Sequence, residues 1–297
     1  VADYNRAIEI RETLVHKENR TELRNELAKA YNNRGLALAA QGDLSAAVAD
    51  YARAVEIYET LVHKEKRTEL RNELASAYNN LGLALADQGD LAAAVADYGR
   101  AVEIFETLVQ KENRKELRND LAMAYNNRGA ALRVQGDLSA AVADYNRAIE
   151  IRETLVHEEG RTELAPNLEK SLFNRAVAYR AQGKRGKARA DLERGWSLLE
   201  EAIRGGRVHL VPGFLQTTGE LGNLLLDMDE APEAAKRINA ALGFCLQEIA
   251  AGRITEVLTK QAAGMYDELR PKVRALKKAG LDVAVFAEVG RKLGIKM

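Results

Sequence analysis

The sequence has few of the residues that cross-link a chain or interrupt a helix. Its 297 residues include one cysteine, Cys245, and four prolines, all of which follow residue 165. A single cysteine excludes an intramolecular disulfide and favours a reducing compartment, so we predict a cytoplasmic protein. Because proline is scarce while Ala, Leu, Glu and Arg are abundant, helix is favoured along nearly the whole chain.

The chain also lacks a net charge and a long apolar run. Lys and Arg total 44, Asp and Glu total 44, and the two signs are mixed along the sequence. Nucleic-acid binding depends on neutralising phosphates, so this balance argues against a nucleic-acid partner. No stretch approaches the roughly 20 apolar residues of a membrane-spanning helix, and no N-terminal signal segment is visible, so we predict no membrane contact.

The most informative feature is an internal repeat with a period of 47 residues. Residues 1–47 and 48–94 differ at only eight positions, and the unit recurs from Val95 and again from Val142. The fourth copy loses its identity after Glu163, and a fifth, degenerate copy follows it. Because Val1 lies in the middle of a repeat, we expect the chain to be a fragment of a longer protein. A repeat of this length predicts a stacked array with local contacts.

Each copy contains two apolar patterns with helical spacing. Helix A is predicted from Glu22 to Ala40 and helix B from Leu44 to His63. Gly42 supplies the left-handed residue that ends helix A, and Asp43 is placed to cap helix B. In the later copies Pro166 and Pro212 predict helix starts, because proline is tolerated in a first helical turn. Since the turn is short, the two helices of a copy are expected to be antiparallel neighbours.

The pattern resembles the tetratricopeptide repeat. The family's alternation of small and large positions is matched here by Tyr31, Gly35, Leu38, Gly42, Ala47, Tyr51 and Ala54 and by their counterparts in the later copies. The period of 47 exceeds the family's usual 34, and the family's helix-ending proline is absent, so both helices are expected to be longer. The resemblance implies an all-α fold, a right-handed superhelical solenoid of antiparallel helix hairpins.

We expect residues 1–253 to form the repeat array, with about five hairpins of which the last one or two are degenerate. Residues 254–297 do not match the repeat. They predict either one long helix from Ile254 to Ala279, kinked or broken at Pro271, or two short helices in its place, followed by a last amphipathic helix from Leu281 to Leu293. An array needs a terminal unit that closes its core, so we interpret residues 254–297 as a helical cap rather than an independent binding module.

The positions at which the copies differ indicate where a partner binds. In the resembling family, one face of helix A lines a concave groove, and four of the five positions on that face vary here. An alternative is that duplicated copies drift first where packing tolerates change. The invariant asparagines of the face suit an extended peptide backbone, because an amide both donates and accepts hydrogen bonds. The predicted binding residues are Lys29, Asn32, Leu36, Ser76, Asn79, Leu83, Asp87, Met123, Asn126, Arg133, Lys170 and Arg180.

Two further variable positions fall elsewhere. One carries Arg34, Leu81, Arg128 and Arg175, and the other carries Arg11, Tyr58, Phe105 and Arg152. We place both at the edges of the apolar stripes, where the aliphatic part of an arginine can cover apolar surface.

The sequence shows no catalytic or metal-binding constellation. His16, His63 and His157 recur one period or more apart, which is too far for a shared metal, and no nucleophile, base and orienting group occur together. Cys245 lies on an apolar helical face and is expected to be buried. We therefore predict no enzyme activity, no cofactor and no metal. The predicted function is a scaffold that binds a partner peptide or helix. The alternative is a regulatory or sensor arm of a larger enzyme or signalling protein, and self-association remains open.

Overall fold

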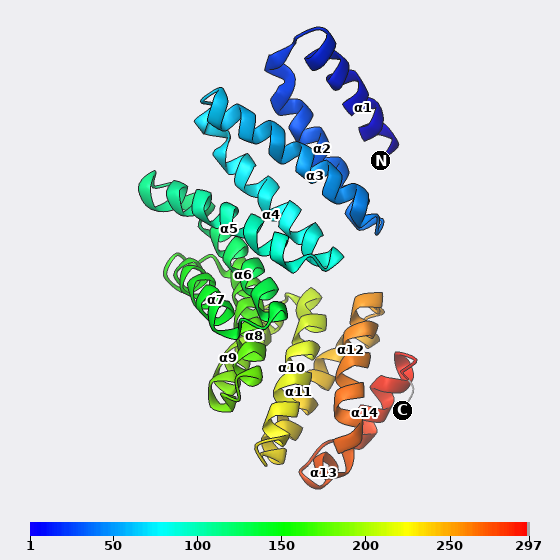
Figure 1. Cartoon of the computed structure of the whole chain (residues 1–297). Coiled ribbons are helices and arrows are strands. Elements are labelled where there is room, and N and C mark those ends of the chain that lie inside the picture. The colour runs from blue at the N-terminus through cyan, green and yellow to red at the C-terminus, as the bar shows by residue number, and fades with distance from the viewer. Residues whose placement is uncertain (296–297) are drawn as a thin grey trace. The chain divides into compact units, whose positions relative to one another are not determined.

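The computed structural model describes residues 1–295, and all regular elements within this range are helical (Figure 1). The chain divides into two compact units, which we call the N-terminal unit (residues 1–151) and the C-terminal unit (residues 152–295). This division does not address where the repeat array ends, so the boundary at residues 253 and 254 stays a prediction.

The N-terminal unit consists of helix hairpins that follow one another in sequence order (Figure 1), and the last helix that begins in it, α7, ends two residues past its boundary. Its helices are α1 (Ala2–Glu12), α2 (Arg24–Ala40), α3 (Leu44–Glu59), α4 (Arg71–Gln88), α5 (Leu91–Glu106), α6 (Arg118–Gln135) and α7 (Leu138–Glu153). Helices α2, α4 and α6 are helices of type A, whereas α1, α3, α5 and α7 are helices of type B. The predicted solenoid of antiparallel hairpins is confirmed.

The turn between the two helices of a hairpin forms as its sequence predicts. Gly89 follows α4 with a φ of +90°, a backbone conformation that side chains with a Cβ disfavour. The carboxylate of Asp90 then accepts a hydrogen bond from the backbone N–H of Ala93, 3.1 Å away, and caps α5.

The extra length of the repeat is found at the outer ends of the helices. A short 3₁₀ turn, Thr21–Leu23, precedes α2, and a π-helical turn, Thr60–Lys64, continues α3. Leu61 and Val62 in that turn are buried, which confirms that helix B extends past the family's usual end.

Glycine allows helices A and B of one hairpin to approach closely. A Cβ placed on Gly82 of α4 would lie 3.0 Å from the ring of Tyr98 on α5 and 3.2 Å from the carbonyl oxygen of Ala94. The tyrosine is almost fully buried against this glycine. The same contact occurs between Gly129 and Tyr145 in the next hairpin, so the repeated Gly–Tyr pair helps to hold the hairpins of the N-terminal unit together.

The C-terminal unit continues the hairpin pattern. Its helices are α8 (Ala165–Ala181), α9 (Arg185–Arg204), α10 (Val211–Leu226), α11 (Ala231–Ala250), α12 (Glu256–Leu269), α13 (Val273–Lys278) and α14 (Val283–Lys292). Pro166 and Pro212 lie in the first turns of α8 and α10, as predicted.

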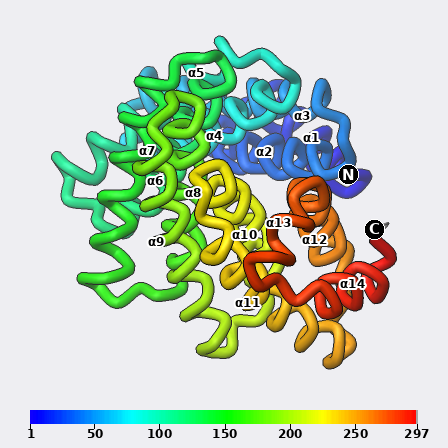
Figure 2. The backbone as a smooth tube through the Cα atoms, turned by 90° about the horizontal axis from the view of Figure 1, so that it is seen from below, coloured from blue at the N-terminus to red at the C-terminus, as the bar shows by residue number. Residues whose placement is uncertain are grey.

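The last three helices pack differently from a hairpin. Helix α12 lies along α10, and α13 and α14 pack against α11; Figure 2 shows α12 beside α10. A 3₁₀ turn, Arg270–Lys272, breaks the helical run at Pro271. The rings of Tyr266 and Phe286 stack with centroids 4.0 Å apart, and the hydroxyl of Tyr266 donates a hydrogen bond to the carbonyl oxygen of Phe286. These contacts cover both helices of the fifth hairpin, which suits a capping role.

Candidate interaction surface

The A helices of the N-terminal unit share a solvent-facing row of side chains, which we call the helix-A stripe. The residues of the row are three or four positions apart in the sequence, so they share one face of each helix. The opposite face packs against helices of type B. Four large apolar side chains of the row are exposed: Leu36 (50%), Leu83 (48%), Met123 (38%) and Val134 (59%). The stripe comprises Glu26, Lys29, Asn33, Leu36 and Ala40 of α2, Glu73, Ser76, Asn80, Leu83 and Asp87 of α4, and Asp120, Met123, Asn127, Ala130 and Val134 of α6.

Polar groups border these apolar side chains. The ammonium group of Lys29 lies 3.0 Å from the carboxylate of Glu26, and both groups are about half exposed. Asp87 is exposed at the C-terminal end of α4, and Ser76 is half-buried. The stripe therefore combines apolar surface with a few fixed charges, which differ from one copy to the next.

The predicted asparagines have a structural partner. The side-chain amide of Asn80 donates to the oxygen of Asn32 at 3.0 Å, and that of Asn127 donates to the oxygen of Asn79 at 3.2 Å. These bonds join consecutive A helices. Asn79 is only 4% exposed and Asn126 only 3% exposed. Such burial leaves both side chains little surface for a peptide.

Two of the predicted arginines also face inward. The guanidinium group of Arg133 lies near the hydroxyl of Tyr145 in its own hairpin. Arg180, in the C-terminal unit, pairs with Glu220 at 2.6 Å and with Asp227 at 3.4 Å. These ion pairs join α8 to α10, so the arginine contributes to packing between consecutive A helices. Lys170, also in the C-terminal unit, is exposed.

The exposed or half-buried predicted residues of the N-terminal unit thus coincide with the stripe, apart from Asn32 and Arg133. The structure exposes Lys29, Leu36, Leu83, Asp87 and Met123. Sequence reasoning missed Val134, whose exposure follows from its place one helical turn beyond Ala130 on the same face. The signal was present, because Val134 occupies the position of Ala40 and Asp87, at which the copies differ.

Packing inside the hairpin explains the variation at a second position, which carries Arg34, Leu81, Arg128 and Arg175. Arg128 of α6 donates two hydrogen bonds of 2.7 Å to Asp144, which is 6% exposed. The pair of Arg34 with Asp50 repeats this geometry in the first hairpin. The second hairpin has Leu81 at the arginine position.

The second hairpin keeps the carboxylate nevertheless. Asp97 is buried, and its partner is Arg100, one turn along the same helix at 2.6 Å. Burial raises the pKa of Asp97, and the arginine only partly offsets this effect. The substitution of arginine by Leu81 therefore redirects an internal ion pair.

The sequence suggested that one variable position lies at a stripe edge, but the structure places it in the interior. This position carries Arg11, Tyr58, Phe105 and Arg152. Tyr58 is 3% exposed, Phe105 is 1% exposed and Arg152 is 4% exposed. The guanidinium group of Arg152 donates to the carbonyl oxygen of Asn167 at 2.9 Å and also contacts Ser171. Burial lowers the pKa of Arg152 to about 10. The copies differ here because the interior accepts either an aromatic ring or a hydrogen-bonded arginine.

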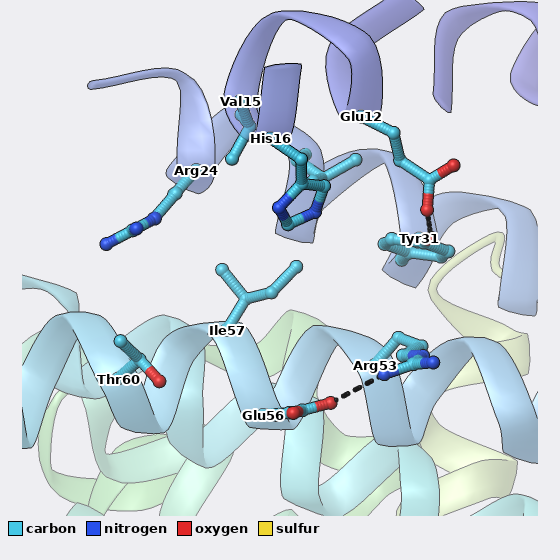
Figure 3. A pocket seen from close by; sticks show the side chains of 10 residues that line it. Glu12, Val15, His16, Arg24, Tyr31, Arg53, Glu56, Ile57 and Thr60 are labelled. Carbon is cyan, nitrogen blue, oxygen red and sulfur yellow. Dashed lines mark hydrogen bonds and ion pairs between the residues drawn. The ribbon is translucent and has the colours of Figure 1, made fainter. Parts of the chain in front are cut away.

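A cleft of about 290 Å³ opens beside α1, α2 and α3 (Figure 3). Figure 3 shows Val15, His16 and Ile57 facing this space. The hydroxyl of Tyr31 is hydrogen-bonded to Glu12 at its rim, and burial together with this carboxylate raises the pKa of Tyr31 to about 12. The phenol therefore remains protonated at neutral pH, and the cleft offers a neutral hydroxyl and apolar walls.

The described residues show no other prominent chemical centre. No group of three or more His, Cys, Asp or Glu side chains within residues 1–295 is arranged to hold a metal ion. Cys245 is buried, as predicted, and burial raises the pKa of its thiol to about 12. None of the helices in this range is long and apolar enough to cross a membrane.

Comparison with known proteins supports the repeat assignment. The sequence profile of the tetratricopeptide repeat family matches residues 26–107 and 73–154. A comparison with curated protein sequences found no match.

Solved structures show the same fold at low sequence identity. BtubC (BKLC) from P. vanneervenii has a TM-score of 0.64 and 17% identity, over 86% of this chain and 91% of that chain. A putative kinesin light chain from Podosopora anserina with nearly identical TPR-like repeats has a TM-score of 0.54 and 19% identity, over 78% and 96%. Aspartyl phosphate phosphatase F from Bacillus subtilis has a TM-score of 0.53 and 16% identity, over 92% and 63%.

Proposed function

Because residues 26–154 belong to the tetratricopeptide repeat family, we propose that the chain is a protein–protein interaction scaffold whose helix-A stripe binds a segment of a partner protein. In this family one face of the A helices lines a concave groove, and the stripe is the equivalent face here. Catalysis is not part of the proposed function, and a cytoplasmic location is expected.

The observation that carries the proposal is the exposure of large apolar side chains on the stripe. Leu36, Leu83, Met123 and Val134 are each more than a third exposed, whereas the large apolar side chains on the packed face of the same helices, such as Leu27, Leu74 and Leu121, are buried. Fully burying a side chain of this size is worth about 1.5–3 kcal/mol. Because these side chains are already half exposed, a partner that covered two of them would gain roughly 1.5–3 kcal/mol by the same measure. Apolar surface surrounded by polar groups is typical of interaction sites.

The variation among copies supports the same surface. Lys29, Ser76 and Met123 occupy equivalent positions, and so do Ala40, Asp87 and Val134. A partner segment that lay across α2, α4 and α6 would therefore meet a different side chain in each hairpin. Variable charges beside apolar anchors provide specificity, since a misplaced partner would leave a charge without a counterpart.

A matched pair of variants tests the proposal. Leu83→Glu combined with Met123→Glu places two charges on the stripe, whereas Ala96→Glu places one on an exposed site of α5, a helix of type B. Each tagged full-length chain is incubated with lysate from the source cells, and captured proteins are quantified by mass spectrometry.

A partner captured by the unaltered chain should decrease at least about 10-fold with the double variant, because a charge buried against apolar surface costs well over 1.4 kcal/mol. It should stay unchanged with Ala96→Glu. Equal recovery of every captured protein by the double variant and the unaltered chain, with both folded by circular dichroism, would refute binding at the stripe.

A further inference from the structure

The helix-A stripe differs in charge from the chain as a whole. The chain has 44 basic and 44 acidic residues, so its formal charges balance. The stripe carries a single ammonium group but four carboxylates: Lys29 against Glu26, Glu73, Asp87 and Asp120. The exposed apolar side chains of the stripe are therefore bordered by an excess of negative charge, and this excess limits what kind of segment can cover them.

Helix α2 shows how the scaffold itself neutralises one of these carboxylates. The ammonium group of Lys29 lies 3.0 Å from the carboxylate of Glu26, three residues earlier on the same helix. Residues three apart are neighbours on a helix surface, so the pair needs no other element. It needs only the lysine, and the equivalents of that lysine in the next two copies are Ser76 and Met123.

Glu73 of α4 occupies the position of Glu26 but lacks such a partner. Ser76 stands at the lysine position, and no ion pair among residues 1–295 involves Glu73. One of its carboxylate oxygens, Oε2, is buried without a hydrogen-bond partner in the same part of the chain. The change from lysine to serine has therefore left a half-buried carboxylate on the stripe without a counter-charge.

Two arginines close to Glu73 are already paired elsewhere. Arg71, two residues earlier, lies 2.6 Å from the carboxylate of Glu112. Arg114, whose charge interacts with Glu73 only weakly, forms its ion pair with Glu116. A buried carboxylate oxygen without a partner costs free energy, and a cation supplied by a bound segment would remove this cost.

Asp87 is a second such carboxylate, at the other end of α4. It is exposed in the last turn of the helix, and no ion pair within the described part of the chain involves it. The C-terminal end of a helix carries partial negative charge, so a carboxylate there is unfavourable. The equivalent positions hold Ala40 and Val134, which shows that the scaffold does not need a charge at this place.

Resting on the proposed function, we propose that the stripe binds a basic amphipathic segment of its partner. Apolar side chains of this segment cover Leu83 and Met123. One of its Lys or Arg side chains pairs with Glu73, and another pairs with Asp87. These two carboxylates lie fourteen residues apart along α4, about 21 Å at the helical rise per residue, so a single cation cannot neutralise both.

The same two carboxylates define which segments are rejected. An acidic segment would place like charges opposite Glu73 and Asp87, and like charges repel. A purely apolar segment would cover Glu73 and remove its carboxylate from water without supplying a counter-charge. The apolar side chains therefore provide affinity, and the carboxylates select a basic partner.

The probes for this selection are two fluorescein-labelled peptides of equal length. One consists of leucine and lysine in helical spacing, and in the other glutamate replaces every lysine. Binding to the full chain is measured by fluorescence anisotropy at low and at high salt. We expect the lysine peptide to bind at least about 10-fold more tightly than the glutamate peptide, and we expect its affinity to fall as the salt concentration rises, because exposed ion pairs are screened.

Substitutions at position 76 test the role of Glu73 with residues taken from the other copies. Ser76→Lys supplies the ammonium group that Lys29 provides for Glu26, so the lysine peptide should bind about 2- to 5-fold more weakly. Ser76→Met, which introduces the residue of the third copy, adds apolar surface without charge. It should leave the affinity unchanged or increase it.

A double variant tests both carboxylates together. Glu73→Gln with Asp87→Asn should weaken binding of the lysine peptide about 5- to 20-fold. Its matched control, Glu56→Gln with Glu103→Gln, removes two exposed carboxylates from helices of type B and should leave the affinity unchanged. Circular dichroism verifies that each chain is folded.

Three results would overturn the inference: no saturable binding of the lysine peptide, equal or tighter binding of the glutamate peptide, or equal effects of the double variant and its control. The pair Leu83→Ser and Met123→Ser separates this failure from failure of the proposed function. If that pair weakens binding of both peptides while the charge variants have no effect, the stripe binds without regard to charge and only the basic character of the partner is wrong. If that pair leaves binding unchanged, the stripe is not the binding surface.

Discussion

Two buried aspartates at equivalent positions should respond in opposite ways to the same substitution. Asp144 is held by two hydrogen bonds of 2.7 Å from Arg128 across its hairpin. The second hairpin has Leu81 at the position of Arg128, and among residues 1–295 Asp97 is bonded only by Arg100, whose side chain is 58% exposed. We expect Asp144→Asn to destabilise the chain and Asp97→Asn to leave its stability unchanged or to raise it.

The magnitude follows from the geometry. A hydrogen bond to a charged group contributes about 1.5–3 kcal/mol, and Asp144→Asn weakens two of them while leaving Arg128 without a counter-charge. The arginine side chain is 25% exposed, so solvent screening reduces the loss, and we expect about 2 kcal/mol. The ion pair of Asp97 is more exposed, and the neutral amide avoids the cost of burying a charge, so the change should lie within about 0.5 kcal/mol of zero or be stabilising.

The effect at Asp97 depends on pH in a defined direction. Burial raises the pKa of Asp97 in the folded state. A carboxyl whose pKa is higher in the folded than in the unfolded state contributes stability at low pH, and this contribution is lost as the pH rises through the folded value. The gain from Asp97→Asn relative to the unaltered chain should therefore be larger near neutral pH than near pH 4.

Urea denaturation followed by far-UV circular dichroism measures both variants. The slope of the free energy against urea concentration must be the same for each chain, because repeat arrays can lose cooperativity when one hairpin is weakened. Equal losses for the two substitutions, or a larger loss for Asp97→Asn, would show that the bidentate pair is not what distinguishes the two hairpins.

Three further predictions follow from the packing and the burial of single side chains. Gly82→Ala should cost about 1–3 kcal/mol because its Cβ would meet the ring of Tyr98, whereas Gly99→Ala, whose nearest neighbour lies 3.9 Å away, should stabilise α5 by about 0.5–1 kcal/mol in the same urea assay. Burial raises the pKa of Glu169 to about 7, so Glu169→Gln should increase the free energy of unfolding by up to about 3 kcal/mol at pH 8. The unaltered chain should become more stable as the pH falls through 7, and the variant should lack this rise. A variant with the same pH profile as the unaltered chain contradicts this prediction. Cys245 should not react with a thiol reagent until the chain unfolds, and labelling at the rate of an exposed thiol would show that its helix opens.

The repeated parts of the fold could be predicted from the sequence because their signals are local. Gly89 and Asp90 determine where one helix ends and the next begins, and Pro166 places a helix start even in a copy whose other residues have changed. Periodic apolar residues then identify the buried faces. All of these depend on residues a few positions apart, so a single sequence is sufficient.

The polar contacts between helices could not be predicted in the same way. Asn79 looked like a ligand for a peptide, but it accepts a hydrogen bond from Asn127, 48 residues away. Arg180 looked like a groove residue, but it pairs with Glu220. Whether a polar side chain faces solvent or the next repeat depends on how far one hairpin is rotated against the next. The spacing of residues along one helix does not predict that rotation.

Variation among copies was a partial guide to the interaction surface. It found Leu83 and Met123, which are exposed, and it also selected Tyr58, which is buried. Copies diverge wherever a substitution is tolerated, and a coordinated change in the interior is tolerated as well as a change on the surface. Exposure separates the two cases, and exposure requires the structure.

The most direct measurement is site-specific photo-crosslinking from the helix-A stripe. A photoreactive amino acid replaces Leu83 on α4 in one full-length chain and Ala96 on α5 in a second, and both are irradiated in lysate from the source cells. We predict a discrete protein adduct from position 83 and none from position 96. Adducts of equal yield from both positions, or an adduct from position 96 alone, would contradict the claim that the stripe binds the partner.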